Sequence, residues 1–140
     1  MPPTADHTDH LFQAALDIRA RAHAPYSDFQ VGVALLTESG AIHTGCNVEN
    51  VSYPEGACAE TGAISAMVAG GGGRIVELCV VADGRRLISP CGGCRQRIAE
   101  FGSPDTIIHC ADLDGIRQTW TLADLLPAAF SMNGTGEGST

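Results

Sequence analysis

The sequence predicts a single α/β domain over residues 1–140, in which a five-stranded sheet has helices packed on it. Three observations lead to this fold class. The 140 residues suffice for one hydrophobic core, because chains divide into separate cores only at roughly 250–300 residues. Apolar residues make up 44% of the chain, which is typical of a packed globule. Segments with helical and strand-like patterns follow one another in the order α-β-β-α-β-α-β-β-α.

The first half of the chain predicts a helix and a β-hairpin. Apolar residues recur at helical spacing between a candidate N-cap, Thr8 or Asp9, and Pro25, which ends the helix. The segments 31–35 and 42–46 then show alternating side chains on either side of a Ser-Gly turn. This alternation around a turn is the pattern of a β-hairpin.

The second half predicts a buried helix, a buried strand and four further elements. Residues 57–69 are small and apolar, so they suit a buried helix that ends at the glycines following it. Residues 75–82 are almost all apolar and often β-branched, which indicates a strand covered on both faces. Pro90 suits the first turn of a helix that runs to about Phe101. The remaining expected elements are strands over 106–110 and 117–122 and a short helix over 123–130.

Composition excludes several classes of partner. The net charge is −8, with 8 basic against 16 acidic residues, so the chain has no basic surface for nucleic acid or for an anionic membrane. The first ten residues lack the features of a signal peptide, and no apolar run approaches the roughly 20 residues of a membrane span. We therefore expect a cytoplasmic protein, with frayed tails over 1–8 and 131–140. Charged residues are only 17% of the chain, which suggests that other copies cover part of its surface.

Two short motifs carry the chemistry. Cys58-Ala59-Glu60 begins the second predicted helix, and Cys91-Gly92-Gly93-Cys94 begins the third. Helix N-termini favour thiolate over thiol, so both cysteine sets suit metal binding. Three thiolates can bind Zn²⁺ and leave a fourth position for water, which is the arrangement of a catalytic zinc site. Glu60, two residues after a ligand, can accept the proton of that water and pass it to a substrate nitrogen.

The cysteine pattern by itself leaves two other interpretations open. Cys-x-x-Cys after a strand also occurs as a thioredoxin-like redox dithiol. A structural zinc site with four protein ligands is the second alternative. Its fourth ligand would come from Cys46, Cys79, Cys110, His43 or His109. Because Cys46, Cys79 and Cys110 lie in strand-like runs, we expect them to be small core residues.

The motifs resemble the signature of the zinc-dependent nucleoside and nucleobase deaminases, Cys-Ala-Glu followed by Pro-Cys-x-x-Cys. The chain is also similar, over roughly residues 10–130, to the small homotetrameric cytidine deaminases. The blocks that carry this similarity are PYSDFQVG at 25–32, GCNVENVSYPEG at 45–56, SPCGGCRQ at 89–96 and LLPAAF at 125–130. The resemblance implies a three-layer α-β-α domain, whose mixed five-stranded sheet carries helices on both faces.

The same resemblance implies a role for particular residues. Cys58, Cys91 and Cys94 would bind one zinc ion per chain, and Glu60 would transfer protons. For the substrate, the resemblance implies that Phe29 stacks on the pyrimidine and that Asn47 and Glu49 hydrogen-bond the ribose hydroxyls. It implies that Tyr53 and Phe130 are aromatic residues that often reach a substrate site across a subunit interface. It also implies that the backbone near Ala57 and Ser89 holds the base edge. The simpler alternatives are packing for the two aromatic residues and turn formation for Asn47 and Glu49.

We therefore expect a hydrolase of pyrimidine salvage that acts on a cyclic amidine C–N bond. It would deaminate cytidine and 2′-deoxycytidine to uridine and 2′-deoxyuridine with a zinc-activated water, release ammonia, and assemble as a homotetramer. The alternatives are the same chemistry on a modified cytidine or a blasticidin-type nucleoside, or a non-catalytic zinc module. One residue departs from the family pattern: Thr61 stands where an arginine commonly offsets the charge of the thiolates. Its hydroxyl would donate to a ligand sulfur or bond back to the helix.

Overall fold

The structure, a computed structural model, describes residues 5–132, so most of the two predicted tails lies outside the described residues. The elements follow the expected order, with one added 3₁₀ turn. They are α1 (Ala5–Arg19), β1 (Gly32–Thr37), β2 (Ile42–Cys46), η1 (Tyr53–Glu55), α2 (Ala59–Ala69), β3 (Ile75–Val81), α3 (Gly92–Phe101), β4 (Ile107–Ala111), β5 (Ile116–Thr121) and α4 (Leu122–Leu125).

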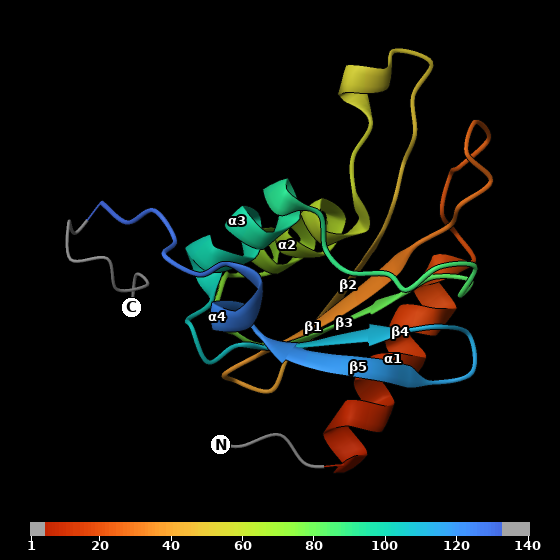
Figure 1. Cartoon of the computed structure of the whole chain (residues 1–140). Coiled ribbons are helices and arrows are strands. Elements are labelled where there is room, and N and C mark those ends of the chain that lie inside the picture. The colour runs from red at the N-terminus through yellow and green to blue at the C-terminus, as the bar shows by residue number, and fades with distance from the viewer. Residues whose placement is uncertain (1–4, 133–140) are drawn as a thin grey trace.

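The five strands form one mixed sheet in the order β2-β1-β3-β4-β5. Only β3 and β4 pair in parallel, and the other neighbours pair antiparallel. Helices α2 and α3 pack on one face of the sheet and α1 packs on the other (Figure 1). The predicted three-layer α-β-α fold is thus confirmed.

Alternation along the strands divides the core between these two faces. Val33 and Leu35 of β1 pack with α2 and α3, whereas Ala34 and Leu36 pack with α1. All six residues of β1 are buried, because successive side chains of a strand point to opposite faces and both faces are covered. The sheet therefore supplies a rigid platform on which α2 and α3 present their N-termini.

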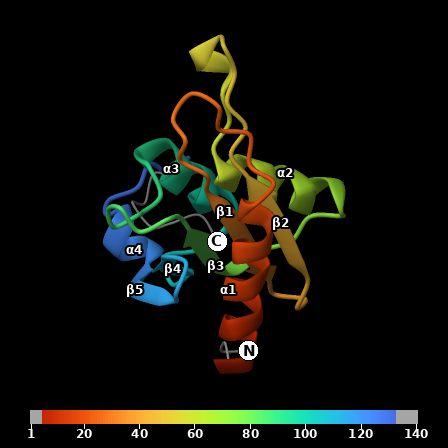
Figure 2. The same cartoon turned by 90° about the vertical axis from the view of Figure 1, so that its right-hand side faces the viewer.

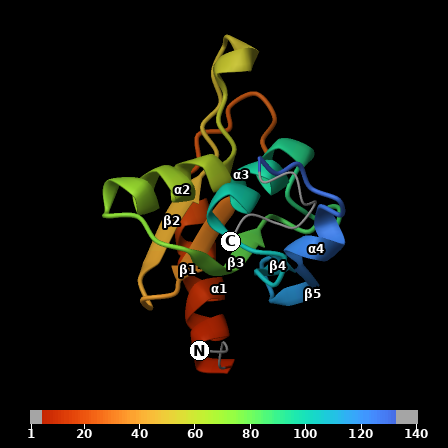
Figure 3. The same cartoon turned by 90° about the vertical axis from the view of Figure 1, so that its left-hand side faces the viewer.

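A close backbone approach sets how near α2 lies to β2. A Cβ atom at Gly45 of β2 would lie 2.2 Å from the backbone nitrogen of Ala63 in α2. Only glycine permits such an approach. The loop before α2, residues 47–58, extends from the body of the domain together with η1 (Figures 2 and 3). The start of α2 thus lies where this loop returns to the sheet.

Both ends of α1 differ from those predicted. Helix α1 begins at Ala5, so neither Thr8 nor Asp9 is an N-cap, and the Thr8 hydroxyl instead donates to Glu77 Oε2 at 3.0 Å. The helix also ends at Arg19, because the chain beyond it turns to pair His23 with Asn47. These two contacts join segments distant in sequence, so the periodicity of the helix did not reveal them.

The last two helices differ for local reasons. Helix α3 begins at Gly92 with Cys91 as its N-cap, so Pro90 precedes the helix rather than lying in its first turn. Helix α4 ends at Leu125 and does not continue to residue 130. Pro127 lacks the N–H that a continuing helix needs, and Ala128 has a positive φ of 53°.

The six cysteines are all free thiols. Cys79 and Cys110 are fully buried, as expected of small core residues, while Cys46 is half-buried. Burial raises the pKa of Cys79 to about 12 and that of Cys110 to about 11, so both stay protonated. Across residues 5–132, none of the helices combines the length and apolarity needed to cross a membrane.

Candidate functional site

Three cysteines that are distant in sequence converge between the N-termini of α2 and α3. Cys58 is the N-cap of α2, Cys91 is the N-cap of α3, and Cys94 follows in the first turn of α3. Their three Sγ atoms lie within 4.8 Å of one another. Cys94 is buried, whereas Cys58 and Cys91 are exposed. The predicted ligand set is therefore assembled by the packing of two helix ends.

The arrangement suits a zinc ion. Sulfur ligands at about 2.3 Å from a tetrahedral zinc ion are separated from one another by about 3.8 Å, which agrees with the spacing of this cluster. Among the described residues, no other His, Cys, Asp or Glu joins the three thiols. None of the five candidate fourth ligands therefore completes a structural site, and His109 hydrogen-bonds Glu77 instead.

The thiols interact strongly with one another. The pKa of Cys58 is lowered to about 6, mainly because the Cys94 thiol donates a hydrogen bond to its sulfur, with smaller effects from Cys91 and the charge of Arg97. The same hydrogen bond raises the pKa of Cys94. A thiolate is thus present at neutral pH, at a helix end whose dipole also favours negative charge.

Glu60 lies beside this cluster in the first turn of α2. Its side chain is only 4% exposed, and burial is the main reason that the pKa of its carboxyl is raised. The charge of Cys58 acts in the same direction. A buried carboxyl with a raised pKa next to a metal-binding cluster has the properties of a general acid–base group.

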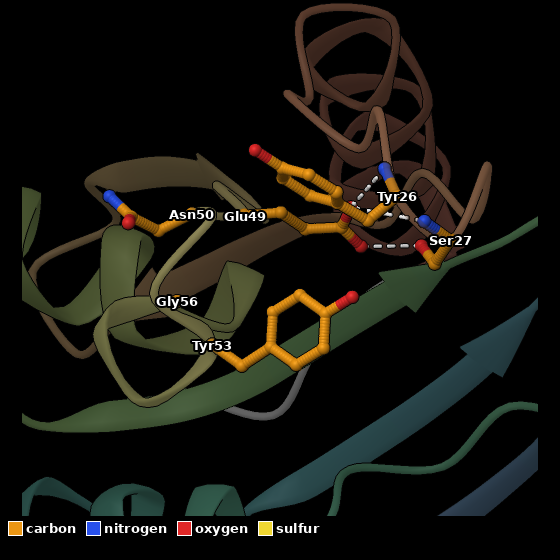
Figure 4. Close-up of a pocket in the computed structure, with 6 residues that line it drawn as sticks. All are labelled: Tyr26, Ser27, Glu49, Asn50, Tyr53 and Gly56. Carbon is orange, nitrogen blue, oxygen red and sulfur yellow. Dashed lines mark hydrogen bonds between the residues drawn. The ribbon is translucent and has the colours of Figure 1, made fainter.

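A pocket of about 380 Å³ lies around Glu49 (Figure 4). The backbone N–H groups of Tyr26 and Ser27 donate to Glu49 Oε1 at 2.9 and 3.2 Å, and the Ser27 hydroxyl donates to Oε2. The Ser27 hydroxyl is the main reason that the pKa of Glu49 is lowered, so its carboxylate is ionised at neutral pH. Tyr26 and Tyr53 form an edge-to-face pair at 5.9 Å that borders the pocket.

Asn47 holds the segment that carries Phe29. Its Nδ2 donates to the Phe29 carbonyl at 2.9 Å, and its Oδ1 accepts from the Val31 N–H at 2.8 Å. The aromatic ring of Phe29 contacts Arg85, whose Cζ lies 5.6 Å from the ring centroid. Asp83 and the Asp28 carbonyl bind this guanidinium. Phe29 is therefore fixed by its backbone and by a cation–π contact.

Ala57 joins the metal cluster to the Glu49 pocket. Its N–H and carbonyl both pair with Val48, at 2.9 and 3.0 Å, so its N–H is not available to a base edge. Because Cys58 follows Ala57 and Glu49 follows Val48, this pairing brings the segment that carries Cys58 alongside the segment that carries Glu49. Ser89 accepts a hydrogen bond from Arg95 and lies two residues before Cys91.

The two remaining aromatic positions are solvent-exposed in the protomer. Tyr53 is 75% exposed and borders the Glu49 pocket, whereas Phe130 is 74% exposed and is not part of its lining. Within one protomer the structure therefore brings Tyr53, but not Phe130, to the Glu49 pocket.

The structure places several residues at the site that the sequence motifs do not predict. Ser27 and Tyr26 belong to the quoted block 25–32, but nothing in the motif showed that they bind Glu49. Arg97 also lies close to the cluster, with Nη1 3.9 Å from Cys94 Sγ. Within the described residues, the Thr61 hydroxyl makes no hydrogen bond to a ligand sulfur. Spacing after Cys94 is the signal that could have identified Arg97, because residues i and i+3 share a helix face.

Comparisons with known proteins agree with this geometry. The cytidine deaminases of Sporosarcina psychrophila and Halalkalibacterium halodurans are 46% and 42% identical to the chain, over 88% and 86% of its length and 90% and 92% of theirs. The crystal structure of cytidine deaminase from Burkholderia pseudomallei superposes with a TM-score of 0.82 at 40% identity, covering 87% of this chain and 98% of that one.

A family profile gives the same result. The family described as "Cytidine and deoxycytidylate deaminase zinc-binding region" matches residues 5–110. This range contains all three clustered cysteines and Glu60. The chain therefore belongs to the cytidine and deoxycytidylate deaminase zinc-binding family.

Proposed function

We propose that this protein is a zinc-dependent cytidine deaminase, which hydrolyses cytidine and 2′-deoxycytidine to uridine and 2′-deoxyuridine and releases ammonia. The observation that carries the proposal is the convergence of three thiol sulfurs within 4.8 Å beside a buried glutamate. The curated relatives at 42–46% identity are cytidine deaminases. Cys58, Cys91 and Cys94 would hold one zinc ion per chain, which, when bound, lowers the pKa of water and so supplies a nucleophile at neutral pH.

Glu60 moves the protons of this reaction. Its carboxylate accepts the proton of the attacking water and delivers it to N3 of the cytosine ring, which makes C4 more electrophilic. It then carries the second proton to the leaving amino group, so ammonia departs as a neutral molecule. Burial of Glu60 supports this role, because a carboxyl with a raised pKa can both accept and donate protons near neutrality.

The Glu49 pocket binds the sugar in this proposal. An ionised carboxylate held by Ser27 can accept a hydrogen bond from a ribose hydroxyl. Asn47 has one amide hydrogen and one lone pair left after it binds the backbone at Phe29 and Val31, so it can also contact the diol. Phe29 stacks on the pyrimidine, and the backbone near Ser89 holds the base edge. The Ala57 carbonyl already accepts from the Val48 N–H, but its second lone pair can accept a hydrogen bond from the base edge.

We also propose that the protein is a cytoplasmic homotetramer. Tyr53 and Phe130 are large aromatic side chains with three quarters of their surface exposed, and such residues are more typical of interfaces than of free surfaces. Contributed by a neighbouring subunit, Phe130 would complete a substrate site that its own protomer does not reach. A reducing compartment suits a site built from three free thiols. Sedimentation analysis distinguishes a tetramer from a monomer.

An ultraviolet assay combined with a zinc determination tests the main proposal. We expect cytidine and deoxycytidine to be deaminated by protein that contains about one zinc per chain. Comparing these with free cytosine and blasticidin S separates a cytidine deaminase from an enzyme for modified nucleosides. Zinc-containing protein that deaminates none of the four compounds would contradict the proposal.

A further inference from the structure

We propose that Arg97 is a positioning residue of the metal site, whose guanidinium holds the Cys94 sulfur and offsets the negative charge of the thiolate cluster. The proposal rests on the proposed zinc-dependent function, and it concerns a residue outside the Cys-Ala-Glu and Pro-Cys-x-x-Cys motifs.

The geometry of α3 brings this side chain to the cluster. Arg97 Nη1 lies 3.9 Å from Cys94 Sγ, within reach of an N–H···S hydrogen bond. Arg97 follows Cys94 by three residues, so both lie on one helix face. Side chains of a helix lean toward its N-terminus, which is the end that carries Cys91 and Cys94. The long side chain of Arg97 therefore extends back from the second turn of α3 to the first turn, which carries Cys94.

Glycine at position 93 leaves room for this guanidinium. A Cβ atom at Gly93 would lie 3.2 Å from Arg97 Nη1, closer than most Cβ contacts. A Cβ atom at Gly92, by contrast, would meet no atom within 4 Å. The two neighbouring glycines thus differ in a way that only the position of Arg97 explains.

No other basic group takes this position. All eight basic residues of the chain are arginines, and all eight lie within the described residues. Arg95, on the same helix, is bound to the Pro90 carbonyl at 2.7 Å, the Leu125 carbonyl at 2.9 Å and the Ser89 hydroxyl at 3.2 Å. Of these eight arginines, Arg97 is the one whose guanidinium hydrogen-bonds a ligand sulfur.

The charge of the site explains why such a group is needed. Three thiolates outweigh the charge of one divalent zinc ion, and the Glu60 carboxyl is buried beside them. The helix dipoles at Cys58 and Cys91 offset only part of this excess. Arg97 adds a full positive charge that does not depend on pH. It reaches the cluster from solvent, so salt will screen its contribution.

Zinc release to a chelator tests the proposal without reference to activity. Zinc-loaded Arg97→Gln should lose its metal about tenfold or more faster than the parent, since residues that support metal ligands typically change affinity 10–100-fold. Arg117→Gln removes the same charge from β5 and should match the parent. Arg97→Lys retains the charge and should recover part of the loss. The difference between parent and Arg97→Gln should shrink in about 1 M salt, where the Debye length is about 3 Å.

A second pair of variants tests the same contact by adding a methyl group at each of the two glycines. Gly93→Ala should shift the guanidinium by a few tenths of an ångström and release zinc faster, whereas Gly92→Ala should behave like the parent. Both changes alter helix propensity equally, so a difference between them reports the contact itself. Equal release from the parent, Arg97→Gln and Gly93→Ala would overturn the role of Arg97 and leave the deaminase proposal intact. A parent protein that binds no zinc would instead contradict the proposed function.

Discussion

His109 Nε2 lies 2.6 Å from Glu77 Oε2, on the face of the sheet that α1 covers. Glu77 is completely buried, and its Oε2 also accepts the Thr8 hydroxyl, while Oε1 has no hydrogen-bond partner among the described residues. The Nδ1 atom of His109 lies 2.8 Å from the Thr119 hydroxyl. Four polar side chains thus connect α1, β3, β4 and β5 on the side opposite to the thiol cluster.

The Glu77–His109 pair should contribute to the free energy of unfolding, because a buried carboxyl is costly without its hydrogen-bond partner. We expect His109→Ala to lower the free energy of unfolding by about 3 kcal/mol or more. Thr119→Val removes only the outer, partly buried contact of His109 and should cost about 1 kcal/mol. Urea unfolding followed by circular dichroism measures both. Replacing both partners, Glu77→Leu with His109→Phe, should recover most of the loss, and equal costs for the two single variants would argue against the assignment.

The zinc ligands give the second prediction. We expect Cys91→Ser and Cys58→Ala to lose most of their metal, because two remaining thiolates hold zinc much less firmly than three. Metal content after dialysis, measured by atomic spectroscopy, checks this expectation. Cys79→Ala is the matched control, since this buried thiol lies on the α1 side of the core and should leave the zinc content unchanged. Metal-free protein with full deaminase activity would rule out the proposed mechanism.

Glu60 gives the third prediction. Glu60→Gln keeps the shape of the side chain but cannot exchange a proton. Turnover of cytidine should therefore fall at least about 10²–10⁴-fold, which is the usual contribution of general acid–base catalysis. Zinc content should stay near that of the parent, because Glu60 is not expected to bind the metal. Near-normal turnover in this variant would remove Glu60 from the mechanism.

The Glu49 pocket gives the fourth prediction. If Glu49 binds ribose, free cytosine should be a very poor substrate, because it leaves the carboxylate without its partner. Glu49→Ala should lower kcat/KM for cytidine about 10–100-fold, as expected for loss of a hydrogen bond to a charged group, and should change any activity on cytosine much less.

Ser27→Ala separates sugar binding from loop support. This variant removes a hydrogen bond to Glu49 but keeps the carboxylate, so most of the preference for nucleoside should remain. A parent enzyme that uses cytosine and cytidine with equal efficiency would refute sugar binding at Glu49.

Local patterns in the sequence were sufficient to predict the fold class and the composition of the metal cluster. The hairpin, the buried strand β3 and the helices α2 and α3 follow from periodicity and turn residues, which act over a few neighbouring positions. Cys58 and Cys91 were placed at helix N-termini for the same local reason, and Glu60 follows Cys58 by two residues. These signals come from neighbouring residues, so they can be recognised without knowledge of the tertiary structure.

Contacts between groups that are distant in sequence depend on how the elements pack. Glu77 and His109 are 32 residues apart, and Thr8 and Glu77 are 69 apart, so no local pattern links them. The same holds for Asn47, whose amide binds the backbone at Phe29. The three-residue spacing between Cys94 and Arg97 is visible in the sequence. Helix α3 carries several polar side chains, however, and only the structure shows which one contacts the sulfur. Hydrogen bonds require atoms to approach within about 3–4 Å, and that condition depends on how the layers pack.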